Sequence, residues 1–146
     1  MATTRISRSI RSSSGAISVG PAKAEQVLLH IDPVSLDLAV MAIARGGAGL
    51  GDLERFFDAL VPGLGRLVRY ELRLLSVLGY VVLVDGVART SEKGRRVLES
   101  AGVSRPIDVL RLLAKALGWW VVRECLDRSP CSELLRSFVG GGNDSR

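Results

Sequence analysis

Arginines recur on one side of a helix predicted over residues 64–78, at a spacing that suits binding to phosphate groups and base edges. At 100° per residue, four side chains lie within an arc of about 100°: Arg66, Arg69, Tyr70 and Arg73. A guanidinium group forms paired hydrogen bonds with phosphate oxygens or with guanine. The opposite side carries an apolar stripe: Val68, Leu72, Leu75 and Leu78. This pattern predicts a helix with a basic outer face, and a solvated face without a partner is the alternative.

A β-hairpin is predicted directly after this helix. Strands over residues 80–84 and 87–90 flank Asp85-Gly86, a dipeptide typical of two-residue hairpin turns. Ser91 then caps a helix over residues 92–100, with the acidic Glu92 in its first turn. Four further basic side chains on the hairpin and this helix are placed to reach phosphates beside a groove: Arg89, Lys93, Arg95 and Arg96.

Three helices upstream would position this surface. The first covers residues 23–30, and the second begins at Asp32-Pro33, because Asp32 can cap free amide groups and Pro33 fits a first turn. Gly46-Gly47 ends the second helix, and residues 49–51 are predicted to form a short loop. The third helix opens at Asp52 and closes at Pro62-Gly63. Its apolar side consists of Leu53, Phe56, Phe57 and Leu60.

The order helix, helix, helix, hairpin, helix resembles the winged helix-turn-helix fold of archaeal and bacterial transcription regulators. The motifs that carry the resemblance are Leu78-Gly79-Tyr80, Asp85-Gly86 and Ser91-Glu92-Lys93-Gly94-Arg95, and the match covers about residues 34–102. The resemblance implies a mainly α fold with a small β-hairpin. It also implies that the helix at 64–78 enters the major groove of DNA, while the hairpin and the following helix contact the backbone.

Two features depart from this family pattern. The helix at 64–78 starts with Pro62-Gly63-Leu64-Gly65, where relatives usually place small hydroxyl or amide residues that bond the DNA backbone. Glu71 is acidic and projects toward the apolar side, so we expect it to pair with Arg45 or Arg55. Winged helices that bind only protein are therefore the main alternative.

The C-terminal part is predicted to contain one long helix over residues 106–127, broken at Ser129-Pro130, and a short helix over residues 131–138. A second apolar stripe on the long helix is predicted to bind another copy of the chain: Val109, Leu112, Ala116 and Trp119. A homodimer would present two recognition helices to a palindromic site. The alternative is that residues 34–43 or 131–138 fold over this stripe within one chain.

Chain length and net charge limit the possible partners and the number of domains. The chain has 146 residues, a net charge of +5 and 17 arginines against three lysines, which suits a polyanionic partner. Residues 1–22 contain Arg5, Arg8 and Arg11 without an acidic residue and predict a flexible basic arm, a transit peptide or a segment without a role. Residues 23–102 are expected to form the winged-helix domain, residues 103–139 its helical extension, and residues 140–146 a disordered tail.

No sequence motif predicts an enzyme. The glycine-rich run at 46–51 follows a helix rather than a strand, and no glycine-rich segment precedes Lys-Ser or Lys-Thr, so no nucleotide-binding loop is expected. His30 is expected to be half-buried and hydrogen-bonded. Cys125 and Cys131 are expected to be free in a reducing cytosol, with a disulfide as the alternative in a hyperthermophile. We expect no cofactor and no metal.

Membrane insertion is excluded by hydropathy, because uncharged apolar stretches such as residues 116–122 are far shorter than the ~20 residues that span a bilayer. Scarce Asn and Gln side chains, one of each, are typical of thermophiles and also of GC-rich genomes. The sequence predicts a cytoplasmic, homodimeric regulator of archaeal type that binds double-stranded DNA in a sequence-specific way. The alternative is a protein-interaction module in a transcription, replication or membrane-remodelling complex.

Overall fold

The structure, a computed structural model, describes residues 21–140. The arm predicted at 1–22 overlaps this range only at the start of the first helix. Of the predicted tail at 140–146, only Gly140 lies within the described residues, where it ends the last helical turn. Most of the described residues are helical and three short strands form one antiparallel sheet, which confirms the predicted mainly α fold. In chain order the elements are α1 (Pro21–Leu29), α2 (Pro33–Ile43), β1 (Ala48–Gly49), α3 (Leu50–Leu60), α4 (Leu64–Val77), β2 (Val81–Val84), β3 (Val87–Thr90), α5 (Glu92–Ser100), α6 (Pro106–Leu117), α7 (Trp119–Leu126), α8 (Cys131–Leu135) and the π-helical turn η2 (Arg136–Gly140).

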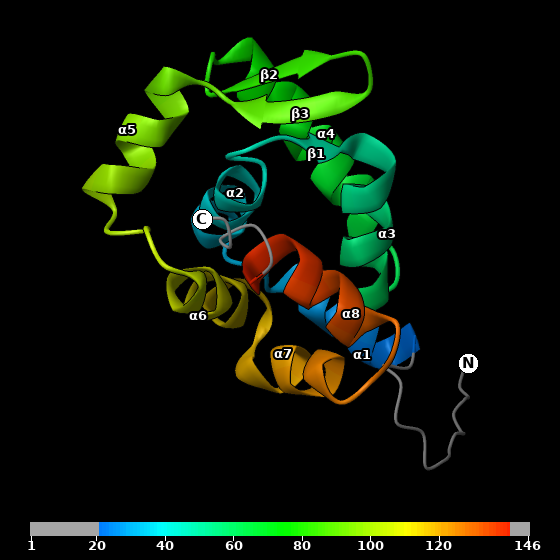
Figure 1. Ribbon diagram of the computed structural model, residues 1–146. Helices are drawn as coiled ribbons and strands as arrows, with labels where there is room; N and C mark the ends of the chain where they lie inside the picture. The colour runs from blue at the N-terminus through cyan, green and yellow to red at the C-terminus, as the bar shows by residue number, and fades with distance from the viewer. Residues whose placement is uncertain (1–20, 141–146) are drawn as a thin grey trace.

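The predicted hairpin forms one end of the molecule (Figure 1). β2 and β3 pair antiparallel, with Val84 opposite Val87 across the turn. Asp85 and Gly86 in that turn both adopt positive φ, 53° and 76°, as two-residue hairpins of this type require. The local motif is therefore sufficient to specify the turn.

A third strand joins the hairpin where the sequence predicts a loop. The prediction of a loop at residues 49–51 is wrong. Ala48 and Gly49 form β1 and pair with β3, which lies between the other two strands, and residues 50–51 already belong to α3, two residues before its predicted start at Asp52. The amide of Leu50 then donates to the carbonyl of Gly86 at 2.8 Å. The segment is short of local strand signals, so only its pairing with β3 makes it a strand.

Helix α2 is the central element of the core, with Leu36, Ala39 and Val40 buried. Pro33 occupies its first turn as predicted. Asp32, however, does not cap a backbone amide; its Oδ2 accepts a hydrogen bond from the hydroxyl of Ser35 at 2.9 Å. Because Ser35 is buried, this bond gives its hydroxyl the partner that burial requires.

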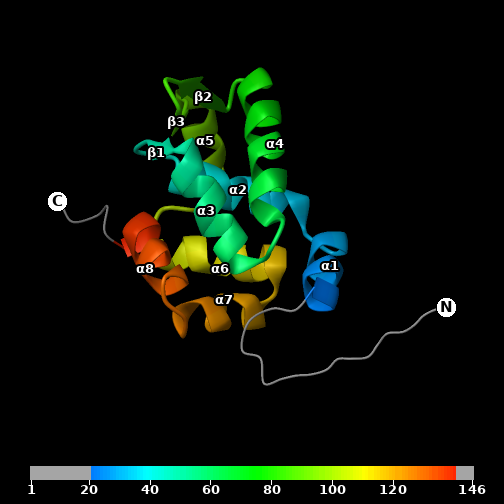
Figure 2. The same cartoon turned by 90° about the vertical axis from the view of Figure 1, so that its right-hand side faces the viewer.

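Helices α3 and α4 lie side by side, as Figure 2 shows. Their close approach depends on Gly65, where a Cβ atom would lie 2.5 Å from the carbonyl oxygen of Glu54. The same residue donates its amide to Asp58 Oδ1 at 2.8 Å. Helix packing therefore requires glycine at position 65, where a larger hydroxyl or amide residue has no room.

The long helix predicted over residues 106–127 is wrong. Gly118, with φ 107° and ψ 138°, separates α6 from α7, and these are not values of helical backbone. Only glycine adopts such a conformation readily, so the chain turns at this residue although the apolar pattern continues through it. α6 packs against α2, and α7 packs against α6 and α3.

This break also changes the stripe that was predicted to bind a second copy. Val109 and Ala116 are 8% and 2% exposed, so they are buried within one chain and cannot form a free dimer surface. Leu112 is half-buried against the core, whereas Trp119 is 52% exposed. Most of this stripe is therefore covered within one chain, as the alternative held. The covering element is mainly α2, and η2 also contacts α6.

The C-terminal helices α6 to α8 share one core with the elements from α2 to α5. Arg128 Nη2 donates to the carbonyl of Ala59 at the end of α3 at 2.9 Å, and the rings of Phe56 and Phe138 pack with centroids 5.4 Å apart. Cys125 and Cys131 form a disulfide that joins α7 to α8, so the expectation of free thiols is wrong and the alternative holds.

Within residues 21–140, no single helix is long and apolar enough to cross a membrane. One pair of helices, Lys23–Leu29 and Pro33–Ile43, reaches that length together but is bent by 96°. α2, the second of the pair, is largely buried in the protein core.

Candidate nucleic-acid interface

The exposed face of α4 carries the four side chains that the sequence places there. Arg66, Arg69 and Arg73 are exposed, and Tyr70 is 58% exposed. The opposite face is buried, because Leu64, Gly65, Val68, Leu72 and Leu75 pack into the core. The predicted stripe is correct except for Leu78, which follows the helix and is exposed.

Not all of these arginines are free to bind a ligand. Arg69 Nη1 lies 3.5 Å from the carboxylate of Glu54 on the neighbouring helix α3. Arg66 and Arg73 form no ion pair or side-chain hydrogen bond with any residue from 21 to 140. Their uncompensated charges are therefore the strongest attraction that this face offers to an anion.

Two of the basic residues, Arg89 on β3 and Lys93 on α5, are held by the protein itself. Arg89 Nη1 donates to the carbonyl of Gly46 at 2.9 Å, which ties β3 to the turn after α2. Lys93 Nζ donates to the carbonyl of Leu78 at 2.9 Å and lies 4.7 Å from the centroid of the Tyr80 ring. Both side chains stay exposed, but a phosphate would have to compete with these contacts.

Helix α5 begins as the motif predicts, since the Ser91 hydroxyl accepts a hydrogen bond from the Gly94 amide at 3.2 Å. Gly94 lies against the carbonyl of Tyr80, leaving no room for a Cβ atom. On the outer side of this helix Arg96 pairs with Glu92 at 3.6 Å. Arg95 is exposed and has no ion-pair partner in the part of the chain that the structure describes.

The same face of α4 changes character along its length. Its basic side chains span Arg66 to Arg73, whereas Leu74 and Val77 near its C-terminal end are 42% and 84% exposed. Leu78 and three hairpin valines are also exposed and large: Val82, Val84 and Val87. Apolar side chains do not bind phosphates, so the basic part of the α4 face ends at Arg73.

An acidic group lies at the start of α4, where the helix dipole would otherwise favour a phosphate. Asp58 accepts the Gly65 amide through Oδ1 and brings a carboxylate to this end of the helix. A DNA backbone can therefore approach the arginines on the side of α4 more favourably than it can approach the helix N-terminus.

Glu71 does not pair with an arginine, so that prediction is wrong. Arg45 donates to the carbonyl of Val103 at 2.8 Å, and Arg55 pairs with Asp52. Glu71 instead faces Asp37 of α2, and burial together with this neighbouring carboxylate raises the pKa of Asp37 to about 7. Asp37 Oδ1 is buried without a hydrogen-bond partner among the described residues. The sequence signal for this half-buried pair was Asp37 itself, the one acidic residue within the otherwise largely apolar α2.

We expect Asp37→Asn to remove a pH dependence of stability. In the parent protein the folded state holds the proton on Asp37 more tightly than the unfolded state does, because the folded pKa is the higher one. The resulting stabilisation is present at low pH and is lost as pH rises through about 7. Because the side chain is half-buried, Asp37→Asn should raise the free energy of unfolding by only about 1 kcal/mol at pH ~8.

Urea denaturation at pH ~5 and ~8 measures this effect. Asp127→Asn removes an exposed carboxylate at the end of α7 and is the matched control, which should leave the pH dependence as it is in the parent. An Asp37→Asn variant that loses stability with pH as steeply as the parent would contradict the assignment of this effect to Asp37.

Two further expectations from the sequence concern His30 and metal binding. His30 is exposed rather than half-buried, although its Nδ1 lies 2.9 Å from the carbonyl of Gln26. Within residues 21–140, no group of three or more His, Cys, Asp or Glu side chains gathers as a metal ion would require.

Comparison of the chain with protein-family models, with curated proteins and with solved structures finds no match. Its function must therefore be argued from the geometry and charge of the described residues.

Proposed function

We propose that the chain is a winged helix-turn-helix protein that binds double-stranded DNA with the exposed face of α4 between Arg66 and Arg73. The observation that carries this proposal is the pair Arg66 and Arg73. Both are exposed on the side of α4 opposite the core, with Tyr70 between them, and neither has an ion-pair partner among residues 21–140. The order of elements from α2 to α5, with a hairpin directly after α4, supports the same proposal.

In this proposal the eight predicted contact residues have unequal roles. Arg66, Tyr70 and Arg73 face the groove, and Arg95 contacts a flanking phosphate. Arg69 joins them when its exposed pair with Glu54 opens, which is a small energetic step for a surface ion pair. Arg89, Lys93 and Arg96 are already engaged within the protein, so they contribute positive potential more than direct bonds.

We expect purified full-length protein to bind a random-sequence duplex of about 20 base pairs with strong salt dependence. Three to four phosphate contacts give a slope of about −3 to −4 in log K against log salt concentration, so affinity falls on the order of a hundredfold between about 50 and 200 mM. Fluorescence anisotropy measures the slope, and the stoichiometry with a palindromic duplex tests the homodimer. Absence of binding at the lowest salt concentration, or binding that salt does not weaken, would contradict the proposal.

A protein-interaction module is the second candidate. It is favoured by the exposed apolar side chains at the end of α4, above all Val77 at 84% exposure and Leu78 at 55%. Monomeric proteins seldom leave a large apolar surface uncovered unless it binds something. The duplex titration separates the two candidates, because apolar contacts release no counterions and give no steep salt slope.

A further inference from the structure

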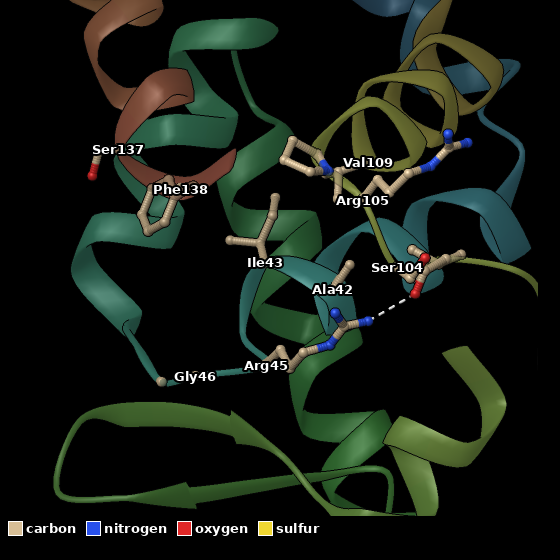
Figure 3. A pocket seen from close by; sticks show the side chains of 12 residues that line it. Ala42, Ile43, Arg45, Gly46, Ser104, Arg105, Val109, Ser137 and Phe138 are labelled. Carbon is tan, nitrogen blue, oxygen red and sulfur yellow. Dashed lines mark hydrogen bonds between the residues drawn. The ribbon is translucent and has the colours of Figure 1, made fainter. Parts of the chain in front are cut away.

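A cavity of about 450 Å³ lies where the winged portion meets the C-terminal helices. Its walls come from the end of α2, from the segment between α5 and α6, from the start of α6 and from η2. Figure 3 shows the side chains of Ile43, Val109 and Phe138 around this space, each from a different element. Its volume is within the range of small-molecule sites in proteins, roughly 300–1,000 Å³.

One side of the cavity is apolar and ordered by the core. Ile43 and Val109 are 7% and 8% exposed, and Phe138 packs against Phe56 with ring centroids 5.4 Å apart. These residues are held by the fold whether or not anything fills the space beside them. A preformed apolar wall of this kind favours a ligand with an apolar body, because such a ligand loses water-exposed surface on binding.

The other side carries one uncompensated positive charge. Arg45 Nη2 donates to the carbonyl of Val103, and its guanidinium has no acidic partner among residues 21–140. Figure 3 shows this side chain running along the cavity toward residues 103–104. Arg105 also lines the space, but Asp108 lies 3.1 Å from its guanidinium and neutralises it. The net charge that a ligand would meet from these arginines is that of Arg45.

We propose that this cavity binds a small organic carboxylate, with its anionic group on Arg45 and its apolar body against Ile43, Val109 and Phe138. A guanidinium with one N–H already placed by Val103 is held in orientation, and its remaining donors can form a charge-assisted pair with two carboxylate oxygens. An inorganic anion would use the arginine but leave the apolar wall exposed, and a neutral compound would use the wall but not the charge. The carboxylate therefore satisfies both sides of the cavity.

The cavity adjoins the part of the protein that carries the hairpin. Gly46 lines the space, and its carbonyl accepts the hydrogen bond from Arg89 of β3. A bound carboxylate would thus touch the turn that Arg89 ties to the sheet. The binding proposal itself does not depend on the proposed function, because its test contains no nucleic acid.

Isothermal titration of the full chain with sodium benzoate and 2-naphthoate tests the inference. We expect binding of one molecule per chain, tighter for the larger naphthoate, and at least about tenfold weaker binding of benzamide and of inorganic phosphate. Arg45→Gln should weaken carboxylate binding at least about tenfold, whereas Arg123→Gln, an exposed arginine on α7 that does not line the cavity, should leave it unchanged.

A second variant covers the case in which Arg45→Gln does not fold, as judged by its circular dichroism. Ser104 is exposed at the edge of the cavity, so Ser104→Trp should obstruct the space without disturbing the core and should abolish benzoate binding. The inference is overturned if neither carboxylate binds up to roughly 10 mM. It is also overturned if phosphate binds as tightly as benzoate, or if Arg45→Gln and Ser104→Trp both bind like the parent.

Discussion

Reversal of charge at Arg66 and Arg73 together should reduce affinity for a random-sequence duplex by about a hundredfold or more at moderate salt. Both side chains project from the exposed face of α4 without a partner among the described residues, so each substitution replaces an available cation with an anion that faces the phosphates. The slope of log K against log salt concentration should flatten by about two units, because two contacts are lost. Fluorescence anisotropy of the Arg66→Glu, Arg73→Glu double variant measures both quantities.

The matched control is the double variant Lys115→Glu, Arg123→Glu. It changes the net charge by the same amount at exposed positions on α6 and α7, which lie at the other end of the molecule from the hairpin (Figure 1). We expect a severalfold loss of affinity from the general change in potential and a nearly unchanged slope. Equal losses in the two double variants would mean that DNA responds only to net charge, and α4 would then not be the contact surface.

Substitution of Gly65 by alanine should lower the free energy of unfolding by about 2–3 kcal/mol, which corresponds to roughly 10 °C in melting temperature. The new methyl group would lie 2.5 Å from the carbonyl oxygen of Glu54 and 2.8 Å from Cγ of Asp58, distances that real contacts do not allow. Because the first of these atoms belongs to the backbone of α3, the two helices would have to move apart. Thermal denaturation followed by circular dichroism measures the change.

Gly51 provides the comparison for this substitution. It lies in the first turn of α3, and a Cβ there would meet only the guanidinium of Arg55, at an ordinary contact distance of 3.7 Å. Gly51→Ala should therefore change stability by no more than about 0.5 kcal/mol, in either direction. If Gly65→Ala melts at the same temperature as Gly51→Ala, the close packing of α3 against α4 is not what requires glycine at position 65.

The boundaries of α4, the hairpin and α5 were predictable because their signals are local. The Asp85-Gly86 turn accepts positive φ, the Ser91 hydroxyl reaches an amide three residues ahead, and Gly79 stops the preceding helix with φ 88°. Each of these effects involves atoms a few residues apart in the chain. Interactions between such close residues favour the same turn or helix end in almost any tertiary context.

The exposed basic face of α4 was predictable for a related reason. Helical periodicity places Val68, Leu72 and Leu75 on one side, and once that side is buried the arginines must lie on the other. The partners of those arginines were not predictable. Arg69 meets Glu54 only because α3 crosses beside α4, and Arg89 meets Gly46 across 43 positions of sequence.

The C-terminal part shows where periodicity misleads. Its apolar pattern runs through Gly118 without interruption, and glycine is compatible with a helix as well as with a turn. Packing of α6 on α2 and of α7 on α3 decides between the two. Val109 and Ala116, which the pattern assigned to a surface for another chain, are buried with α6.

The helical class, the hairpin and the basic outer face of α4 follow from local sequence, because caps, turns and periodicity act over a few residues. Which charges remain available depends on long-range packing, since an ion pair or a half-buried carboxylate such as Asp37 depends on what a distant segment brings beside it. The cavity beside Arg45 also depends on segments that are distant in the sequence. Its walls come from three parts of the chain between residues 42 and 138, and no local pattern encodes the space between them.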